Sequence, residues 1–373
     1  MDQFEAIDVI MLLGIAQGFF LAITLPAVHR NNTGANAVLA VQLAMACLVL
    51  FAKLAIYRAG EFWVLQRGIL LEPFIFLYGP LGYIYLKRLL EKGNELFRLQ
   101  WIQYVPALLY LIYLIYINML PTPVFSDKWM AGEFVVPFFW IEALAVVHNF
   151  YFWFLCGRLV FQYRKKERLQ LSFVQSSTSF IKLVHIIVGF ILFVWVFSFL
   201  NSNFFRLKFW VINYDMVWIG IPILIYVVGY YALRQPEIFR IPITETPEST
   251  PVKNRLPDAE IKFLKSKLEE LIETEKVYLK NELTLSDLSQ ELNTSTNNLS
   301  WLLNNIYQSS FYEFINRHRI QEFLQKIKNN EHSKRTLLSL SLEVGFNSKS
   351  TFNKAFKSIL NDTPTSYIKK MGI

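Results

Sequence analysis

The chain has 373 residues, of which 54% are hydrophobic, 16% aromatic and only 18% charged, and its formal net charge is +8. A soluble chain normally carries about 25% charged residues, so this composition argues against a protein that is soluble throughout. Residues 7–233 form a series of long apolar stretches, whereas residues 234–373 are rich in Lys, Glu, Asn and Ser. The sequence therefore predicts an all-α protein with a membrane domain followed by a soluble domain.

Seven stretches of the first part are long enough to cross a bilayer, for which an α-helix needs about 20 apolar residues. The expected spans are residues 7–28, 37–57, 68–86, 102–120, 134–157, 180–200 and 211–233. Successive apolar runs of this length exclude a membrane β-barrel. The first span follows the acidic residues Asp2 and Glu5 rather than the basic start of a signal peptide, so we expect it to be retained.

Local features of the spans predict how they pack and how they are oriented. Gly14 and Gly18 permit close helix packing in the first span, and Pro73 and Pro80 are expected to kink the third. The loops on the side of the carboxyl-terminal tail carry ten Lys and Arg residues, against five in the opposite loops. Because basic loops remain in the cytoplasm, seven spans place the amino terminus outside and the tail in the cytoplasm.

Several ionisable residues fall inside the expected spans, where each carries an energetic penalty of at least about 2.5 kcal/mol unless it has a partner. Four of them are candidates for a ligand pocket or ion path: Glu72, Glu142, His148 and Asp215. Hydrogen bonding between helices is the alternative interpretation. Cys47 and Cys156 lie in apolar segments without a neighbouring Cys or His pair, so we expect no metal site and no cofactor.

A proline-rich stretch over residues 234–257 predicts an extended cytoplasmic linker, since proline this dense cannot continue a helix. Its prolines are Pro236, Pro242, Pro247, Pro251 and Pro257. A helical stripe then follows, consisting of Ile261, Leu264, Leu268, Leu271 and Ile272. This stripe either packs on the following domain, which we favour, or pairs with a second copy of the chain as a short coiled coil.

Residues 258–373 read as two helix-turn-helix units, over about 284–304 and 336–357, joined by a long amphipathic helix. The first unit begins with a capping box at Thr284 and Asp287, and its second helix is expected to bury Leu299, Leu302, Leu303 and Ile306. The outer face of that helix carries Asn297, Asn298, Ser300, Trp301 and Asn304. Asn side chains can pair with adenine edges, so this face is a candidate base reader.

The second unit repeats this pattern with a more basic outer face. Its second helix is expected to be buried through Phe352, Phe356 and Ile359, and a further helix begins at Thr363 and Pro364. The outward residues are Ser348, Lys349, Ser350, Asn353, Lys354 and Lys357. Residues 344–373 have a net charge of +4, whereas residues 284–304 have −2, so attraction to phosphates is expected mainly at the second unit.

The run Leu342 to Lys357, followed by Thr363-Pro364 and Tyr367, resembles the AraC/XylS family of transcription regulators, and the likeness covers about residues 259–370. This resemblance implies recognition helices at about 295–304 and 348–357, placed in neighbouring major-groove segments. Two positions depart from the family pattern: Ser341 replaces the usual Ala, and Trp301 stands where Arg or another polar base reader is common.

The membrane part also looks like that of multi-spanning regulators common in Bacteroidetes-type bacteria, through residues 78–85 and 230–239. The resemblance implies a location in the bacterial cytoplasmic membrane. The expected partners are double-stranded DNA and the lipid bilayer, with a small-molecule or protein signal and a second copy of the chain as further candidates.

The leading hypothesis is therefore a one-component sensor that is not an enzyme: a signal at the membrane domain changes the DNA-binding population of the tail. A second hypothesis is a transporter or membrane enzyme that carries a regulatory DNA-binding tail. A third makes the soluble part a protein-binding module, in which case replacing Lys354 and Lys357 would leave function intact.

Overall fold

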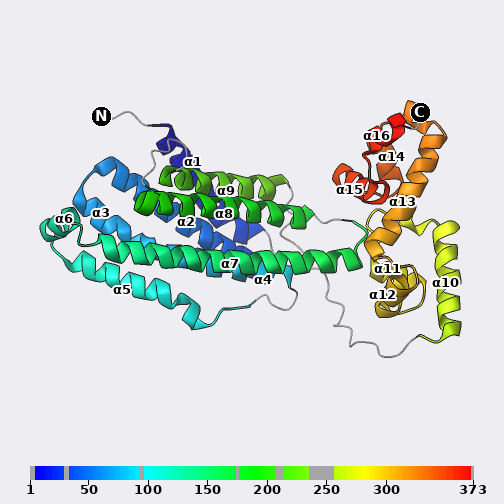
Figure 1. Cartoon of the computed structure of the whole chain (residues 1–373), viewed down its shortest axis with the longest axis horizontal. Helices are drawn as coiled ribbons and strands as arrows, with labels where there is room; N and C mark the ends of the chain where they lie inside the picture. The colour runs from blue at the N-terminus through cyan, green and yellow to red at the C-terminus, as the bar shows by residue number, and fades with distance from the viewer. Residues whose placement is uncertain are drawn as a thin grey trace. The chain divides into compact units, whose positions relative to one another are not determined.

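The computed structural model describes residues 5–28, 33–91, 96–173, 176–205, 213–234 and 256–370 (Figure 1). Within these ranges the regular elements are helical, apart from one isolated antiparallel bridge between Leu171 and Thr284. The chain divides into two compact units, which we describe separately. The first comprises residues 1–161 and 176–244, and the second comprises residues 162–175 and 245–373.

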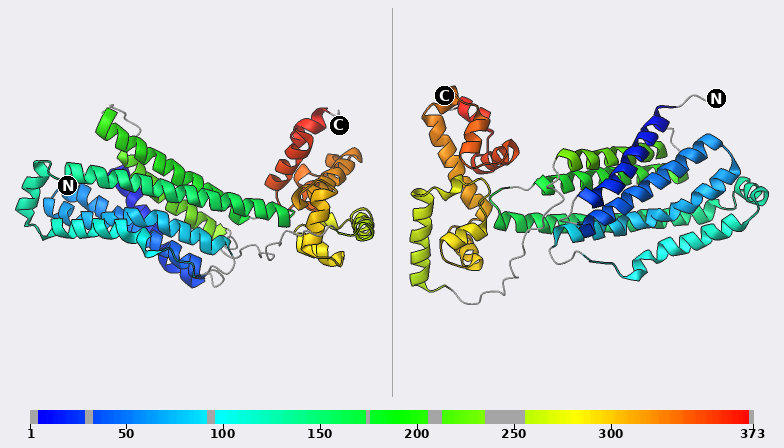
Figure 2. Two further views of the ribbon diagram at one scale, coloured as in Figure 1. Left: turned by 60° about the horizontal axis from the view of Figure 1, so that its bottom comes forward. Right: turned by 180° about the vertical axis from the view of Figure 1, so that it is seen from behind.

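The first unit is built from long apolar helices that run side by side (Figures 1 and 2). Its elements are α1 (Ala6–Val28), α2 (Thr33–Ala59), α3 (Phe62–Gly68), η2 (Ile69–Phe74), α4 (Ile75–Leu90), η3 (Trp101–Tyr104), α5 (Val105–Met119), α6 (Thr122–Met130), α7 (Val135–Gln170), α8 (Ser176–Leu200), η4 (Asn201–Phe205) and α9 (Tyr214–Arg234). Among the described residues six helices are long and apolar enough to cross a membrane, and a bent pair brings the number to as many as seven.

That bent pair is the third expected span. The segments Phe62–Phe76 and Tyr78–Leu90 meet at 41°. The bend follows the 3₁₀ turn η2, which contains Pro73, and proline cannot donate the backbone hydrogen bond that would continue an α-helix. The kink expected from the prolines is therefore present. Gln66 holds the end of α5 beside it, because its Nε2 donates to the carbonyls of Ile117 and Leu120 at 3.1 and 2.9 Å.

Close packing of α1 depends on its two glycines, as the sequence predicts. A Cβ atom on Gly14 would lie 2.7 Å from the Pro222 side chain of α9, and one on Gly18 would lie 2.3 Å from the Cys47 sulfur of α2. Cys47 is itself fully buried. These positions therefore bring α1 against both neighbours at a distance that any larger residue would prevent.

The helix α7 is longer than expected. The predicted span ends at residue 157, but α7 continues through the basic run at residues 164–168 to Gln170. The polar run contains no proline or glycine that would end the helix, so a charged stretch does not by itself terminate it. The short helix α6, which lies between α5 and α7, was not predicted.

The second unit contains the two helix-turn-helix units. Its elements are α10 (Asp258–Glu273), η6 (Val277–Leu279), α11 (Leu285–Glu291), α12 (Thr296–Asn305), α13 (Phe311–Lys328), η7 (Glu331–Ser333), α14 (Leu337–Glu343), α15 (Lys349–Leu360) and α16 (Pro364–Lys370). Helix α13 runs from the cluster containing α11 and α12 to the cluster containing α14, α15 and α16 (Figures 1 and 2). Phe311, Phe314 and Ile315 at its start belong to the first hydrophobic core, whereas Ile320, Phe323 and Ile327 belong to the second.

The apolar stripe of α10 packs into the first core. Leu264, Leu268, Leu271 and Ile272 are all buried there, so the stripe is not available as a coiled-coil seam. One core prediction is wrong: Ile306 is 42% exposed. Helix α12 ends at Asn305, so Ile306 is only its C-cap residue and leaves the buried face. Of the linker prolines, only Pro257 is within the described residues, where it precedes α10.

Gly345 occupies a backbone conformation that side chains rarely adopt. Its φ is +97°, and a Cβ atom there would lie 2.5 Å from the Tyr278 carbonyl oxygen and 2.8 Å from Nε of Arg319. Both contacts are with buried groups that have no room to move. The turn between α14 and α15 therefore requires glycine for its dihedral angle and for the space around it.

We expect Gly345→Ala to lower the free energy of unfolding of the second unit by about 1–3 kcal/mol from backbone strain alone, with the steric clash added. Thermal unfolding of the full chain in detergent, followed by proteolysis of the second unit, measures this loss. Asn361→Ala is the control, because Asn361 has a similar positive φ of 54° but already carries a Cβ. Its loss should be at most about 1–2 kcal/mol, because Ala adopts the left-handed conformation less readily than Asn but meets no steric clash, and equal losses for the two variants would contradict the steric argument.

Candidate nucleic-acid interface and intramembrane polar cluster

Helix α15 has one buried and one exposed face. Phe352, Ala355 and Phe356 are at most 2% exposed and belong to the second core. The opposite face carries the side chains predicted to contact DNA, and all of these are exposed: Lys349, Ser350, Asn353, Lys354 and Lys357. The structure therefore brings five of the six predicted residues of this unit onto one solvent-facing surface of a helix, which we call the α15 face.

The sixth predicted residue, Ser348, has a different position. It is the N-cap of α15, and its Oγ accepts a hydrogen bond from the backbone N–H of Thr351 at 3.2 Å. The same oxygen lies 2.9 Å from Oγ1 of Thr351. Ser348 is therefore engaged in starting the helix that carries the α15 face, a role that serine commonly has at this position.

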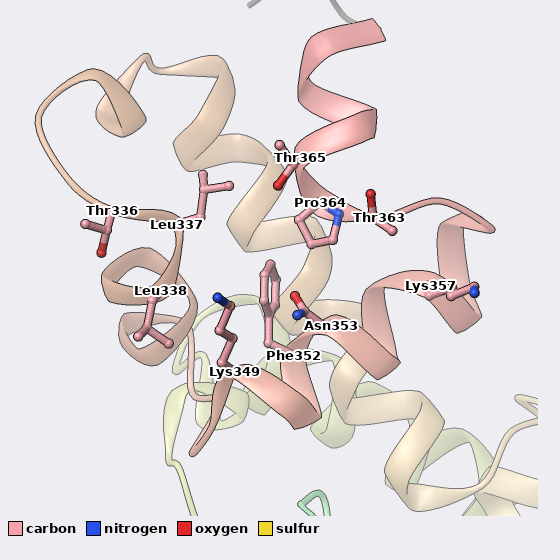
Figure 3. Close-up of a pocket in the computed structure, with 10 residues that line it drawn as sticks. All are labelled: Thr336, Leu337, Leu338, Lys349, Phe352, Asn353, Lys357, Thr363, Pro364 and Thr365. Atoms are coloured by element: carbon pink, nitrogen blue, oxygen red, sulfur yellow. The ribbon is translucent and has the colours of Figure 1, made fainter.

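A hollow of about 510 Å³ lies beside the α15 face (Figure 3). In Figure 3 the side chains of Lys349, Phe352 and Asn353 rise from α15 toward Pro364, whereas Lys357 lies apart along the helix. The remaining lining residues come from the starts of α14 and α16: Thr336, Leu337, Leu338, Thr363 and Thr365. The basic face is thus bordered by hydroxyl groups, which can donate hydrogen bonds to phosphate oxygens.

In the second helix-turn-helix unit and the helix that follows it, more lysines lie on α15 than on α16. Nζ of Lys370 donates to Oδ2 of Asp362 at 2.7 Å. This hydrogen bond, together with those from Ser366 and Thr363, holds the pKa of Asp362 below its ordinary value. Asp362 therefore stays ionised and offsets part of the Lys370 charge on α16.

Helix α12 presents a neutral surface. Asn297, Asn298, Ser300 and Trp301 are partly buried, and Asn304 is exposed. Some of its polar groups already have partners on the helix, since Nδ2 of Asn304 lies 3.3 Å from Oγ of Ser300. The five predicted residues thus lie together near one helix surface, without a cationic group among them. Base contacts from this surface would depend on amide, hydroxyl and indole groups alone.

In the first unit, two of the four predicted intramembrane residues join a hydrogen-bonded cluster. Oε1 of Glu142 on α7 accepts from Nε1 of Trp195 on α8 at 2.8 Å and from the Tyr214 hydroxyl on α9 at 2.9 Å. Glu72 accepts from the Tyr110 hydroxyl of α5. Glu72 and Glu142 also lie within electrostatic range of each other. Three helices, α5, α8 and α9, therefore supply hydrogen-bond donors to these two carboxylates.

Lys53 and Asp215 extend this cluster. Lys53 on α2 is within electrostatic range of both Glu72 and Asp215, and its Nζ lies 4.9 and 5.1 Å from the ring centres of Tyr57 and Trp218. The Tyr57 hydroxyl donates to Oδ1 of Asp215 at 3.0 Å. We define the polar cluster as Lys53, Glu72, Glu142 and Asp215 with their aromatic partners. Within the described residues no group of three or more His, Cys, Asp and Glu side chains could hold a metal ion.

His148 does not belong to the polar cluster. Its Nε2 lies 3.1 Å from the Phe76 carbonyl oxygen, and its ring contacts those of Phe76 and Phe152. The neighbouring Asn149 donates to the carbonyls of Ile75 and Ala145, both at 2.9 Å. For this pair the alternative interpretation, hydrogen bonding between helices, describes the structure. The contacts with Phe76 and Ile75 join α7 to the start of α4, next to the bend.

The tyrosine and tryptophan donors of the polar cluster were missed by sequence reasoning. Tyr57, Tyr110, Trp195 and Tyr214 stand among 60 aromatic residues, so nothing in their local sequence separates them from lipid-facing rings. Only the packing of distant helices brings their polar atoms to carboxylates. Lys53 lies near the end of the second expected span, where snorkelling of its side chain toward the interface also explains a charge, so it is not among the four predicted residues.

Comparison with known proteins bears on the second unit. Residues 288–370 match the family model described as a helix-turn-helix domain, in its AraC-type form. The match begins in α11 and ends in α16, so it includes both recognition helices. No curated protein and no solved structure matches the chain significantly. Residues 288–370 thus form an AraC-type helix-turn-helix domain, which supports DNA binding and a role in transcription regulation.

The two serines of α15 give a test of their separate roles. Ser348→Ala should lower the free energy of unfolding by about 0.5–2 kcal/mol, because it removes an N-cap hydrogen bond. Ser350→Ala, on the exposed face, should change it by less than about 0.5 kcal/mol. Thermal unfolding of both variants in detergent distinguishes them, and a larger loss for Ser350→Ala would show that the roles are assigned wrongly.

Proposed function

We propose that this protein is a membrane-tethered, sequence-specific transcription regulator, and that its membrane domain is a sensor. The observation that carries the proposal is the joining of two features in one chain. The exposed α15 face lies on a helix-turn-helix scaffold, and the described part of the same polypeptide contains six helices, or up to seven, that are long and apolar enough to cross a membrane. The DNA-binding tail then works from the cytoplasmic surface of a bacterial inner membrane.

We infer that recognition is divided between the two helix-turn-helix units. Lys349, Lys354 and Lys357 supply phosphate attraction and base contacts from α15, with Asn353 and Ser350 between them. Helix α12 contributes shape and amide contacts without charge. Binding should therefore depend on salt concentration mainly through the second helix-turn-helix unit. A second copy of the chain is a candidate partner, because paired domains would double the number of contacts.

We infer that the polar cluster is the sensing site of the membrane domain. It collects one lysine and three carboxylates from α2, η2, α7 and α9, and buried charges within a bilayer are retained mainly where they bind or transmit something. A small polar or charged signal that replaces one of these hydrogen bonds would favour one arrangement of the helices over another. The same cluster supports the alternative of a transporter with a regulatory tail, which substrate uptake into vesicles dependent on Glu142 or Asp215 would favour.

Lys354→Ala should weaken DNA binding by about 1–3 kcal/mol if Lys354 contacts a base, and Lys357→Ala should reduce the salt slope by about 0.9 if it contacts a phosphate. Full-length protein in lipid nanodiscs, titrated with promoter DNA identified by genomic footprinting, measures both effects. Lys328→Ala is the matched control, since Lys328 is an exposed lysine at the end of α13, outside the α15 face. Unchanged binding for both α15 variants would instead support a protein-binding module.

Ser350→Cys should react with a membrane-impermeant maleimide only after spheroplasts are permeabilised, because the tail is expected in the cytoplasm. Met130→Cys, in α6 and 76% exposed in the wild type, should react in intact spheroplasts. The native Cys47 and Cys156 are buried and give a low background. Labelling of Ser350→Cys in intact spheroplasts would place the tail away from the chromosome and reject the proposal.

A further inference from the structure

Residues 162–175 belong to the second unit, although they precede its main part by about a hundred residues. They comprise the last turns of α7 and the residues that follow. Tyr163, Glu167 and Leu171 are 5%, 3% and 7% exposed, and their spacing of four places them on one side of a helix. The next residue, Ser172, is completely buried. A continuous face of this segment therefore packs into the second unit.

Main-chain hydrogen bonds define how the segment is held. Leu171 forms an antiparallel bridge with Thr284, the N-cap of α11. The N–H of Ser172 donates to the Leu283 carbonyl at 3.3 Å, and the Ser172 hydroxyl donates to the same oxygen at 2.7 Å. The segment thus pairs like a short strand with the turn that begins the first helix-turn-helix unit. Because main-chain hydrogen bonds are directional, this pairing also fixes the orientation of the segment.

The side chains that bind the segment lie on α13. Nδ2 of Asn316 and Nη1 of Arg319 both donate to the Ser172 carbonyl, at 2.9 and 3.2 Å. Both side chains are completely buried. Arg319 also donates to the carbonyls of Tyr278 and Lys280, at 2.6 and 2.7 Å. The Ser172 carbonyl is therefore one of the oxygens that solvate the buried guanidinium of Arg319. If Ser172 moved away, the remaining hydrogen bond that the structure shows for Nη1 would be the 3.3 Å contact with Oδ1 of Asn316.

Helix α7 links this segment to the polar cluster within one element. It contains Glu142 near its start and ends at Gln170, beside Leu171. At 1.5 Å per residue its 36 residues span roughly 54 Å, which exceeds a hydrocarbon core of about 30 Å, so the basic last turns lie outside the lipid.

We propose that residues 167–172 are a docking segment that couples α7 to the DNA-binding domain, and that the docked domain is competent to bind DNA. The segment contacts Leu283, Thr284 and the first half of α13, none of which belongs to the α15 face. With the segment in place, Lys349, Ser350 and Lys357 remain exposed. The claim of DNA competence rests on the proposed function, whereas the docking itself does not.

Hydrogen–deuterium exchange of the full chain in lipid nanodiscs tests the docking without any DNA. The Ser172 amide should exchange more than about tenfold more slowly than an unstructured amide. Leu171→Asp should abolish this protection, because it places a carboxylate in a buried position. Leu169→Asp should preserve it, because Leu169 in the same segment is 37% exposed. Fast exchange of Ser172 in the wild type would overturn the proposal, and so would equal effects of the two substitutions.

A cysteine pair tests the same contact independently. Leu171→Cys with Thr284→Cys places two cysteines opposite each other across the bridge, where the Cα atoms of an antiparallel pair are about 4.5–5.5 Å apart, a separation that a disulfide can span. The pair should oxidise rapidly in native membranes, whereas Leu169→Cys with Thr284→Cys should not. Equal oxidation of the two pairs would overturn the docking.

The oxidised and reduced forms of the first pair then separate docking from DNA binding. DNA affinity should agree between them within about twofold, since docking leaves the α15 face free. A loss of more than about tenfold on oxidation, recovered on reduction, would overturn the claim that the docked state is DNA-competent while leaving both the docking and the DNA-binding function in place. Absence of binding in both forms, with normal cross-linking, would contradict the proposed function instead.

Discussion

The organisation of the second unit depends on the buried guanidinium of Arg319. This side chain is completely buried, and the hydrogen bonds that the structure shows for it go to carbonyl oxygens of Tyr278, Lys280 and Ser172 and to Oδ1 of Asn316. Burial lowers the pKa of Arg319 to about 10, so the group remains charged at neutral pH. A charge in this position must be solvated by fixed dipoles, because water does not reach it. The requirement ties two separate chain segments to α13, one at Ser172 and the other at residues 278–280.

The buried guanidinium of Arg319 also restricts the turn of the second helix-turn-helix unit. Arg319 lies 5.7 Å from the centre of the Phe346 ring, and Nε would be only 2.8 Å from a Cβ atom on Gly345. The turn between α14 and α15 is therefore shaped against the guanidinium and cannot accept a larger residue. Since α13 also contributes side chains to both hydrophobic cores, α12 and α15 are both supported by one helix, which has the buried charge of Arg319 at its middle. Rigid presentation of this kind favours binding to two neighbouring groove segments.

In the membrane domain, aromatic side chains donate hydrogen bonds to the carboxylates, just as backbone carbonyls accept hydrogen bonds from the guanidinium of Arg319. Trp195, Tyr214 and Tyr110 donate to the carboxylates of Glu142 and Glu72. Each donor has an apolar body that packs among helices and one polar atom that reaches a partner, so charged groups can be held without water. Because these donors come from different helices, displacement of one donor would change several helix contacts together.

The sequence by itself determined the helical class, the number and approximate positions of the apolar stretches, and the helix-turn-helix pattern. These features depend on local periodicity and on capping residues such as Thr284 and Asp287, which act over three or four positions and leave a readable pattern. It also identified the exposed residues of α15, because burial of Phe352 and Phe356 leaves only one face for the lysines.

The tertiary structure alone decided which distant groups meet. Four features depend on contacts between segments far apart in the chain: the partners of Glu142, the separation of His148 from the polar cluster, the extension of α7 to Gln170, and the hydrogen bond that Arg319 donates to the Ser172 carbonyl. A hydrogen bond between residues that are 147 positions apart leaves no periodicity in the sequence, because either partner could be satisfied by many other groups. Only the packed helices select one of them.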